Sequence, residues 1–446
     1  MADSGTPHAF KVIIIGCGPI GLATAHALHA AGIEFVLLER REKIVEDSGA
    51  SIIVWPHTLR VLHQLGILEQ ALEIGDELIH HLTFNAEGHA FSAGRRWERV
   101  RLNHGHWALA FHRSELLELM YNALPLQVRQ NIHTGKDLAG IEMNEGGVNV
   151  TCSDGSTYHG SMVIGADGAH SKTRRLMRSL ALTSDPSRCW DPEHPFVASY
   201  RLLFGSFPTA SEPGQGYDTH SQDKSIAYFS GKRRGWAFMY DKLPKPTCER
   251  TEYTSDDTES LAQEFAGYHL TETLRVKDVW PTMQVKGITD LHEGIVQHWS
   301  IGRIVLVGDS CHKFTTHLGL GCNEGIQDVV VLCNGLRRLL GKSTKGSPGL
   351  SSLEEVFQAY EQLRKDPIQS SLIFDLETSG FETRMHTWSS YSNWILSRYL
   401  TAPSFMDNVV LDFAISPQFQ KARVLDYINK AEPMNGKFPW LHNMSP

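Results

Sequence analysis

Residues 10–21 read FKVIIIGCGPIG, and this stretch decides the fold. The apolar, β-branched run Phe10–Ile15 predicts a strand that is buried on both faces. Glycines at positions 16, 18 and 21 follow it at once. In this pattern the first glycine permits a tight turn, the second leaves room for a pyrophosphate beside the backbone, and the third lets helix and strand pack closely. The stretch therefore predicts a dinucleotide site at the end of a strand.

The next segments complete a strand–helix–strand unit. Leu22–Ala31 is alanine-rich and predicts a helix that Gly32 ends, and Glu34–Leu38 predicts a second strand. Such a unit predicts two parallel strands joined by a right-handed crossover. Glu39 follows the second strand, 18 positions after Gly21. A carboxylate there can accept both hydroxyls of a ribose, which favours an unphosphorylated ribose such as that of FAD or NAD.

Composition describes an ordinary globular chain. Its 446 residues are 41% hydrophobic and 21% charged, which excludes a disordered, collagen-like or coiled-coil protein. The formal net charge is −8, and an acidic chain repels phosphate backbones, so no nucleic-acid partner is expected. The seven cysteines are scattered without a C-x-x-C pair, and the histidines show no useful ligand spacing. These patterns predict a reducing, cytoplasmic location and no metal site.

The start of the chain lacks the basic-then-apolar layout of a signal peptide. The longest apolar stretch runs from Trp394 to Ile415, and charged residues and a proline interrupt it. We expect it to pack in a core, with peripheral membrane contact as the alternative. The run Lys232-Arg233-Arg234 is expected to form a solvated turn, with attraction for dinucleotide phosphates as a second interpretation.

Two more acid-bearing turns follow predicted strands. The first is Gly165-Ala-Asp167-Gly-Ala-His-Ser171, after the predicted strand Thr157–Ile164. The second is Gly308-Asp309-Ser-Cys-His312, after the buried run 301–307 and ahead of an apolar helix predicted at Ile326–Leu340. Each alone can be a helix-capping turn, because Asp and Ser are good caps. Their order behind the glycine motif is what makes them informative.

The ordered set of these three motifs resembles the class A flavin-dependent monooxygenases, the relatives of para-hydroxybenzoate hydroxylase, over about residues 10–375. Asp47-Ser-Gly-Ala-Ser-Ile, Gly302–Lys313 and the tail around Arg398-Tyr399 look similar to the fungal members that act in secondary metabolism. That branch includes epoxidases of prenylated precursors and hydroxylases of aromatic polyketides. The resemblance implies an α/β fold: a Rossmann-like FAD-binding domain with a parallel sheet, an inserted mixed-sheet substrate domain and C-terminal helices.

The resemblance also implies cofactor contacts. Glu39 would hold the ribose of the FAD adenosine, and Asp309 would bind the ribityl or pyrophosphate region of FAD. Arg113, at the start of the predicted helix Arg113–Leu124, would contact FAD. Asp167 would face FAD and the reduced nicotinamide cofactor. The remaining implied cofactor residues are the loop near the flavin ring, Gly49 and Ala50, the backbone beneath the ring, Gly319, Gly321 and Cys322, and the motif glycines Gly16, Gly18 and Gly21. The family usually has proline at position 316, where this chain has Thr316.

Substrate contacts are expected from the middle of the chain. Arg201 is the first candidate, because a cation there could hold a phenolate or protonate an opening epoxide. The alternative is an ion pair at the surface or beside FAD. Tyr228 is a second candidate catalytic residue. Trp236, Phe238 and Tyr240 alternate as in a strand and either line an apolar substrate pocket or form sheet core.

The expected activity is that of an FAD-dependent monooxygenase that uses NADPH or NADH and O2, through a flavin C4a-hydroperoxide. It would epoxidise or hydroxylate a small hydrophobic organic substrate, with a prenylated or terpenoid one favoured. An aromatic hydroxylase is the alternative. A flavin halogenase and a non-catalytic flavin-binding protein are more remote, because the chain has no W-x-W motif and keeps the full acid and arginine set.

The expected domain division is discontinuous. Residues 10–180 and 285–370 would form the FAD-binding domain. Residues 181–284, with part of 75–112, would form the substrate domain, and 371–446 a helical C-terminal region. The oligomeric state stays open.

Overall fold

The protein is described from a computed structural model that covers residues 9–47, 51–144, 146–342, 348–384, 412 and 415–445, without the side chains of 91–92 and 372–384. The expected flavin-loop residues Gly49 and Ala50 lie outside the described residues. So does most of the apolar stretch 394–415. No helix of the described residues is long and apolar enough to cross a membrane.

A mostly parallel sheet forms the first layer of the described fold. Its strand order is β18-β19-β12-β1-β2-β8, and only the β18–β19 pair is antiparallel. Its strands are β1 (Lys11–Ile15), β2 (Glu34–Leu38), β8 (Ile132–His133), β12 (Met162–Gly165), β18 (Ser300–Ile301) and β19 (Ile304–Leu306). Chain segments far apart in sequence thus build one sheet, with β1 at its centre.

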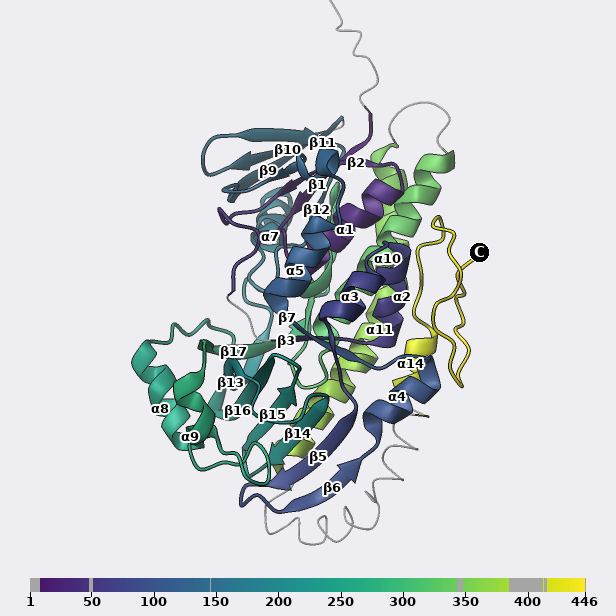
Figure 1. The fold of residues 1–446 in the computed structure, drawn as a ribbon. Helices are drawn as coiled ribbons and strands as arrows, with labels where there is room; N and C mark the ends of the chain where they lie inside the picture. Colours follow the sequence, from purple (N-terminus) through teal and green to yellow (C-terminus); the bar gives the residue numbers. More distant parts are fainter. Residues whose placement is uncertain are drawn as a thin grey trace, which may run out of the picture.

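A larger, mixed sheet forms the second layer. Among the described strands its order is β20-β17-β13-β16-β15-β14-β5-β6, antiparallel except for the β14–β5 pair. The strands are β5 (His80–Asn85), β6 (Ala90–Gly94), β13 (Val197–Pro208), β14 (Gln215–His220), β15 (Lys224–Ser230), β16 (Arg234–Thr247), β17 (Val285–Ile295) and β20 (His312–Lys313). Figure 1 shows this sheet below the parallel one, with α8 and α9 on its outer side.

Two small sheets complete the strands of the described chain. The order β11-β10-β9 joins β9 (Leu138–Asn144), β10 (Gly147–Cys152) and β11 (Thr157–Gly160). The order β3-β7-β4 joins β3 (Ser51–Val54), β7 (Leu109–His112) and β4 (Asp76–Glu77). The β3–β7 pair lies between the two large sheets (Figure 1) and carries side chains toward the space that separates them.

The described α-helices are α1 (Pro19–Ala30), α2 (Pro56–Gln64), α3 (Leu68–Ile74), α4 (Arg96–His104), α5 (Arg113–Asn122), α6 (Leu126–Arg129), α7 (Lys172–Ser184), α8 (Ser255–Phe265), α9 (Val276–Val279), α10 (Leu320–Lys342), α11 (Leu350–Arg384) and α14 (Ser416–Gln420). Short 3₁₀ turns occupy Trp280–Thr282 and Gly308–Ser310. Helices α1 and α10 pack together beside the parallel sheet (Figure 1).

The expected α/β fold is confirmed, with differences at element boundaries. Thr157–Ile164 was expected to be one strand, but it divides at Ser161 into β11 and β12, which belong to different sheets. The expected boundary at residue 284/285 assigns Val285–Ile295 to the FAD-binding domain, but this segment is strand β17, which pairs along β13 in the second sheet. The rest of the domain division stays a prediction.

Candidate active site

The glycine turn 16–21 is shaped by what surrounds each glycine. Gly16 has a φ of +101°, and an added Cβ there would lie 2.6 Å from the Ala166 carbonyl oxygen. At Gly21 an added Cβ would lie 1.9 Å from the Gly16 carbonyl oxygen, so α1 can approach β1 only without a side chain. At Gly18 an added Cβ meets no atom of the described residues within 4 Å. Open space therefore borders the turn at Gly18, at an α1 N-terminus that no side chain of the described residues caps.

Glu39 lies against this turn, as the spacing predicts. One carboxylate oxygen accepts a hydrogen bond from the Cys17 backbone N–H at 2.7 Å, and the other accepts from the Arg41 N–H at 3.0 Å. Burial and the Glu39 charge raise the pKa of the Cys17 thiol to about 12, so that thiol stays protonated. Glu39 is thus held at the end of β2 with its carboxylate beside the glycine turn.

A cavity of about 550 Å³ lies between the glycine turn and the second sheet. Five of the predicted cofactor residues line it: Arg113, Asp309, Gly319, Gly321 and Cys322. Ser51, Ile52 and Ile53 of β3 lie on the same side. The opposite side is aromatic and aliphatic, with Leu202, Phe204, Phe229, Phe238, Tyr240 and Leu291 from the second sheet and Phe314 from the segment after the Gly-Asp turn.

Charged groups lie on the glycine-turn side of this cavity. Arg113 begins α5. Burial lowers the pKa of its guanidinium, the positive charge of Arg41 lowers that pKa further, and the negative charge of Asp309 raises it. Asp309 forms an ion pair with Lys313 at 2.7 Å. Burial, with the charge of Asp309, raises the pKa of the Cys322 thiol to about 12. Cys322 is therefore a neutral side chain in the cavity.

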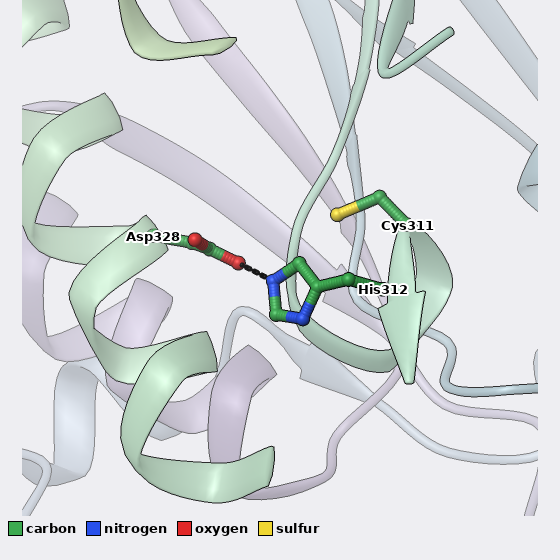
Figure 2. Close-up of side chains that lie close together, drawn as sticks. All are labelled: Cys311, His312 and Asp328. Atoms are coloured by element: carbon green, nitrogen blue, oxygen red, sulfur yellow. Dashed lines mark hydrogen bonds and ion pairs between the residues drawn. The ribbon is translucent and has the colours of Figure 1, made fainter. Parts of the chain in front are cut away.

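A buried network behind the Gly-Asp turn holds it in place. The Asp328 carboxylate accepts hydrogen bonds from the Gly308 N–H at 2.9 Å, from His312 at 2.6 Å and from Arg364 at 2.8 Å. Figure 2 shows Cys311, His312 and Asp328 close together, with the His312–Asp328 contact dashed. Because both oxygens of Asp328 already accept hydrogen bonds, we interpret this cluster as support for Asp309 rather than as metal ligands.

Asp167 lies at the N-terminus of α7. One oxygen accepts from the Ser171 hydroxyl at 2.6 Å, and the other accepts from the Thr173 N–H at 2.9 Å and from its hydroxyl at 3.0 Å. Ser171 in turn accepts from the Arg174 N–H as the N-cap. In the described contacts Asp167 thus stabilises the start of a helix, which is the alternative that the sequence left open.

The two expected catalytic residues are not among the residues that line the cavity, and their catalytic role stays a prediction. Arg201 is on the outer face of β13, where it pairs with Asp241. Lys224 contacts Asp241 and Glu264 of α8 there. Tyr228 is buried on the same outer face, stacked on Tyr217 with ring centroids 5.4 Å apart. Side chains alternate along a strand, and the sequence does not say which set faces the cavity.

Tyr240, Thr316 and His317 form a cluster at the cavity that sequence reasoning did not single out together. The Tyr240 hydroxyl and the Thr316 hydroxyl are 3.0 Å apart, and the His317 ring stacks on Tyr240 with centroids 3.8 Å apart. Burial lowers the pKa of His317 to about 3, so its ring is neutral. Proline at position 316 could not make this hydrogen bond. The departure from the family pattern at Thr316 was the available signal.

A second, polar recess of about 400 Å³ continues from the cavity. It shares His170, Asp290 and His292 with the cavity and adds Arg250, Glu252 and Tyr253 among its lining residues. Tyr253 donates to Asp290 at 2.5 Å. Burial and then the charge of Arg250 lower the pKa of His170 to about 4. The space is therefore apolar inside and polar at one end.

These residues fit FAD. The open space at Gly18, the uncapped α1 N-terminus and the Glu39 carboxylate suit a dinucleotide, since helix N-termini bind phosphate and acids bind ribose. The cavity is lined by Pro19 and Ile20 at the start of α1, by Arg113 and Asp309, and by Gly319 and Gly321.

Comparison with known proteins agrees with this fit. A family model described as "FAD binding domain" matches residues 9–185 and 222–355. The chain is 33% identical to the FAD-dependent monooxygenase srdH of Neurospora crassa, over 97% of this chain and 98% of that protein. It is 30% identical to the FAD-dependent monooxygenase adrH of Penicillium rubens, over 90% and 83%.

A solved structure has the same fold. Klebsiella pneumoniae HpxO, complexed with FAD and uric acid, superposes with a TM-score of 0.71 at 21% identity and covers 91% of this chain and 97% of that one. With the family model and the fungal relatives, these matches decide the family: the chain belongs to the FAD-dependent monooxygenases of class A.

Proposed function

We propose that this monooxygenase takes electrons from NADPH or NADH and inserts one oxygen atom of O2 into a hydrophobic intermediate of fungal secondary metabolism. Epoxidation or hydroxylation of a prenylated or terpenoid compound is the favoured reaction. The observation that carries the proposal is the apolar sheet side of the cavity, which faces the proposed flavin residues. Such a surface binds hydrocarbon and excludes water.

Each group at the site has a proposed role. FAD, when bound and reduced, supplies the activation of O2. Glu39 holds the adenosine ribose, Arg113 and Asp309 hold the middle of the cofactor, and Cys322 contributes a neutral surface beside the ring. The other proposed cofactor contacts are Gly16, Gly18 and Gly21 at the pyrophosphate, Gly49, Ala50, Gly319 and Gly321 near the flavin ring, and Asp167 toward FAD and the reduced nicotinamide cofactor.

The substrate is proposed to lie along the aromatic residues of the second sheet. Phe204, Phe229 and Phe238 offer ring faces and edges to an apolar body. The polar recess with Arg250 and Glu252 suits an oxygenated end of the same molecule. A substrate that is apolar over most of its length and polar at one end fits both parts.

One observation favours aromatic hydroxylation as a second candidate. A phenol needs a hydrogen-bonding group near its oxygen to favour the reactive phenolate. The Tyr240 hydroxyl lies on the sheet side of the cavity and bonds to Thr316 at 3.0 Å. It could turn toward a phenolic oxygen instead.

The test starts from the visible spectrum of the purified protein. Bound flavin absorbs near ~450 nm. We expect anaerobic NADPH or NADH to bleach this band slowly alone and faster with a prenylated or phenolic compound, and ¹⁸O2 to label the product. Flavin that neither donor bleaches would overturn the proposed reductant. Turnover without ¹⁸O in the product would overturn oxygen insertion and favour a halogenase, whereas no substrate-stimulated oxidation of NADPH would favour a binding role.

A further inference from the structure

His112 is a buried histidine that joins the two sides of the cavity. It is the last residue of β7 and directly precedes Arg113. The Trp236 indole N–H of β16 donates to its Nδ1 at 3.2 Å. Its Nε2 lies 2.6 Å from an Asp47 carboxylate oxygen. The histidine side chain is 1% exposed, whereas Asp47 is 52% exposed.

These contacts fix the protonation pattern of the ring. A tryptophan indole nitrogen is only a donor, so Nδ1 of His112 accepts and carries no proton. A carboxylate only accepts, so Nε2 carries the proton and donates it to Asp47. In this arrangement the ring carries its proton on Nε2 only. A proton on Nδ1 would face the Trp236 N–H donor, and an unprotonated Nε2 would face the Asp47 acceptor.

The position of His112 relates it to the expected flavin loop. Its backbone pairs with Ser51 across the β3–β7 ladder. Its side chain bonds to Asp47, and residues 48–50 separate Asp47 from Ser51. His112 thus contacts the described residues on both sides of that short segment. Ser51 and Arg113, its ladder partner and its chain neighbour, both line the cavity.

Trp236 ties the same histidine to the substrate side. It is buried two residues before Phe238, which lines the cavity, and it pairs with Phe229, which also does. The start of β16 is fixed to α5 nearby, because Arg234 pairs with Glu115 at 2.8 Å. The β15–β16 turn is therefore anchored at α5 by an ion pair and at His112 by a hydrogen bond.

We propose that His112 is a positioning residue that couples the substrate sheet to the flavin end of the cavity. Trp236 fixes the His112 ring, and the ring holds Asp47. This rests on the proposed location of the flavin. When β16 shifts, Trp236 moves the His112 ring, and the ring moves Asp47 and the paired residue Ser51. The loss of either hydrogen bond breaks this connection. Arg113 follows His112 directly, so a displaced His112 also displaces Arg113 at the start of α5.

The test measures the cofactor rather than turnover. FAD is titrated into apoprotein for its Kd, and visible circular dichroism reports the surroundings of the bound flavin. His112→Asn keeps an acceptor for Trp236 near Nδ1 but loses the donor to Asp47. Trp236→Phe keeps the ring and loses the donor. Each should raise the Kd by about tenfold and change the flavin circular dichroism. Trp236→Phe should have no further effect in the His112→Asn background, because both act through Asp47.

Trp440→Phe is the matched control, since it removes a buried indole donor to the Met434 carbonyl elsewhere. It should lower stability and leave both flavin readouts unchanged. Additive effects of the two substitutions, or equal effects of the control, would overturn the coupling. Asp309→Asn separates the two proposals: if it leaves the Kd unchanged, the location of the flavin is wrong; if it weakens binding while Trp236→Phe does not, only the role of His112 is wrong.

Discussion

Single residues at the glycine turn differ in what a methyl group would meet. Gly18 has room around it and a φ of −75°, which any residue adopts, whereas Gly21 is packed onto the Gly16 carbonyl oxygen. The same substitution should therefore act on different properties at the two positions. One position borders the open space at the α1 N-terminus, and the other controls how closely α1 approaches β1.

We expect Gly18→Ala to weaken FAD binding by at least tenfold with little loss of stability, because the methyl group enters the space at the turn. Gly21→Ala should destabilise the fold by several kcal/mol, since a Cβ at 1.9 Å from a backbone oxygen forces the chain to move. FAD titration and denaturant unfolding of both apoproteins measure the two effects. A Gly18→Ala protein that unfolds as early as Gly21→Ala would contradict this assignment.

The Tyr240 hydroxyl offers a second test at this scale. Tyr240→Phe removes its hydrogen bond to Thr316, and we expect a stability loss of about 1 kcal/mol. Thr316→Val should cost the same, and the double variant should cost no more than either alone. Tyr217→Phe, on the outer face of the sheet, is the control for losing a tyrosine hydroxyl. Additive losses at Tyr240 and Thr316 would show that the two hydroxyls do not act as a pair.

Local patterns predict elements whose determinants are local. The strand Glu34–Leu38 and the start of α5 at Arg113 lie where the sequence indicates. The division of Thr157–Ile164 could not be predicted, because it depends on Ser161, whose N–H donates to the Lys11 carbonyl oxygen far away in the chain. Where a residue far away in the sequence determines the end of a strand or helix, the local sequence does not indicate that end.

The start of α10 and the faces of β13 show the same limit. The apolar pattern indicates a helix from Ile326, but α10 begins at Leu320, where the Asn323 amide donates to the Ile53 carbonyl and accepts from the Trp55 N–H. Arg201 lies on the outer face because Asp241 and α8 are there. Which face of a strand meets the cofactor depends on helices that the strand's own sequence does not describe.

Asp167 gives a prediction about an element. Its carboxylate accepts three hydrogen bonds at the start of α7, so Asp167→Ala should destabilise the protein by about 1–2 kcal/mol. Asp167→Asn should lose less, because an amide oxygen can still accept from the Thr173 N–H. Chemical unfolding measures both.

If Asp167 acts only as a cap, the rate of flavin reduction by NADPH should stay within about twofold of the parent in Asp167→Asn. A large fall in that rate with unchanged stability would instead assign Asp167 a direct contact with the reductant. The two readouts therefore separate a structural role from a binding role.

At the scale of the whole molecule, the parallel sheet gathers the motifs. β19, β12 and β1 are neighbours, and the turns with Asp309, Asp167 and Gly16 follow their carboxyl ends. The order of the motifs in the sequence predicts this edge, because ligands bind at the carboxyl ends of parallel strands. The opposite side of the cavity comes from long antiparallel strands with no chemical motif. Their alternating aromatic residues left a pocket wall and a sheet core both open, and Phe238 and Tyr240 line the cavity.

Buried histidines give the molecule a pH dependence. Burial lowers the pKa of His57 to about 3 and of His26 and His104 to about 4, from the ordinary value of 6.5. The unfolded chain then binds protons more readily than the folded one below pH 6.5. Stability is full above that pH and is lost as pH falls toward 4, by on the order of 1 kcal/mol per pH unit for each histidine.

Denaturant unfolding of the holoenzyme at pH 7, 6 and 5, with FAD kept saturating, measures this loss. His26→Gln is the matched variant, because the His26 Nε2 contact with the Met120 carbonyl, at 2.7 Å, can be replaced by an amide donor. Its stability should fall less steeply with pH, by about one proton's share of the loss that all histidines with lowered pKa cause, His170 and His317 included. Carboxylates with lowered pKa, such as Asp328, titrate below this range and leave the slope unaffected. A parent protein whose stability is the same at pH 7 and pH 5, or a variant with the parent's slope, would show that these histidines take up protons without unfolding the chain.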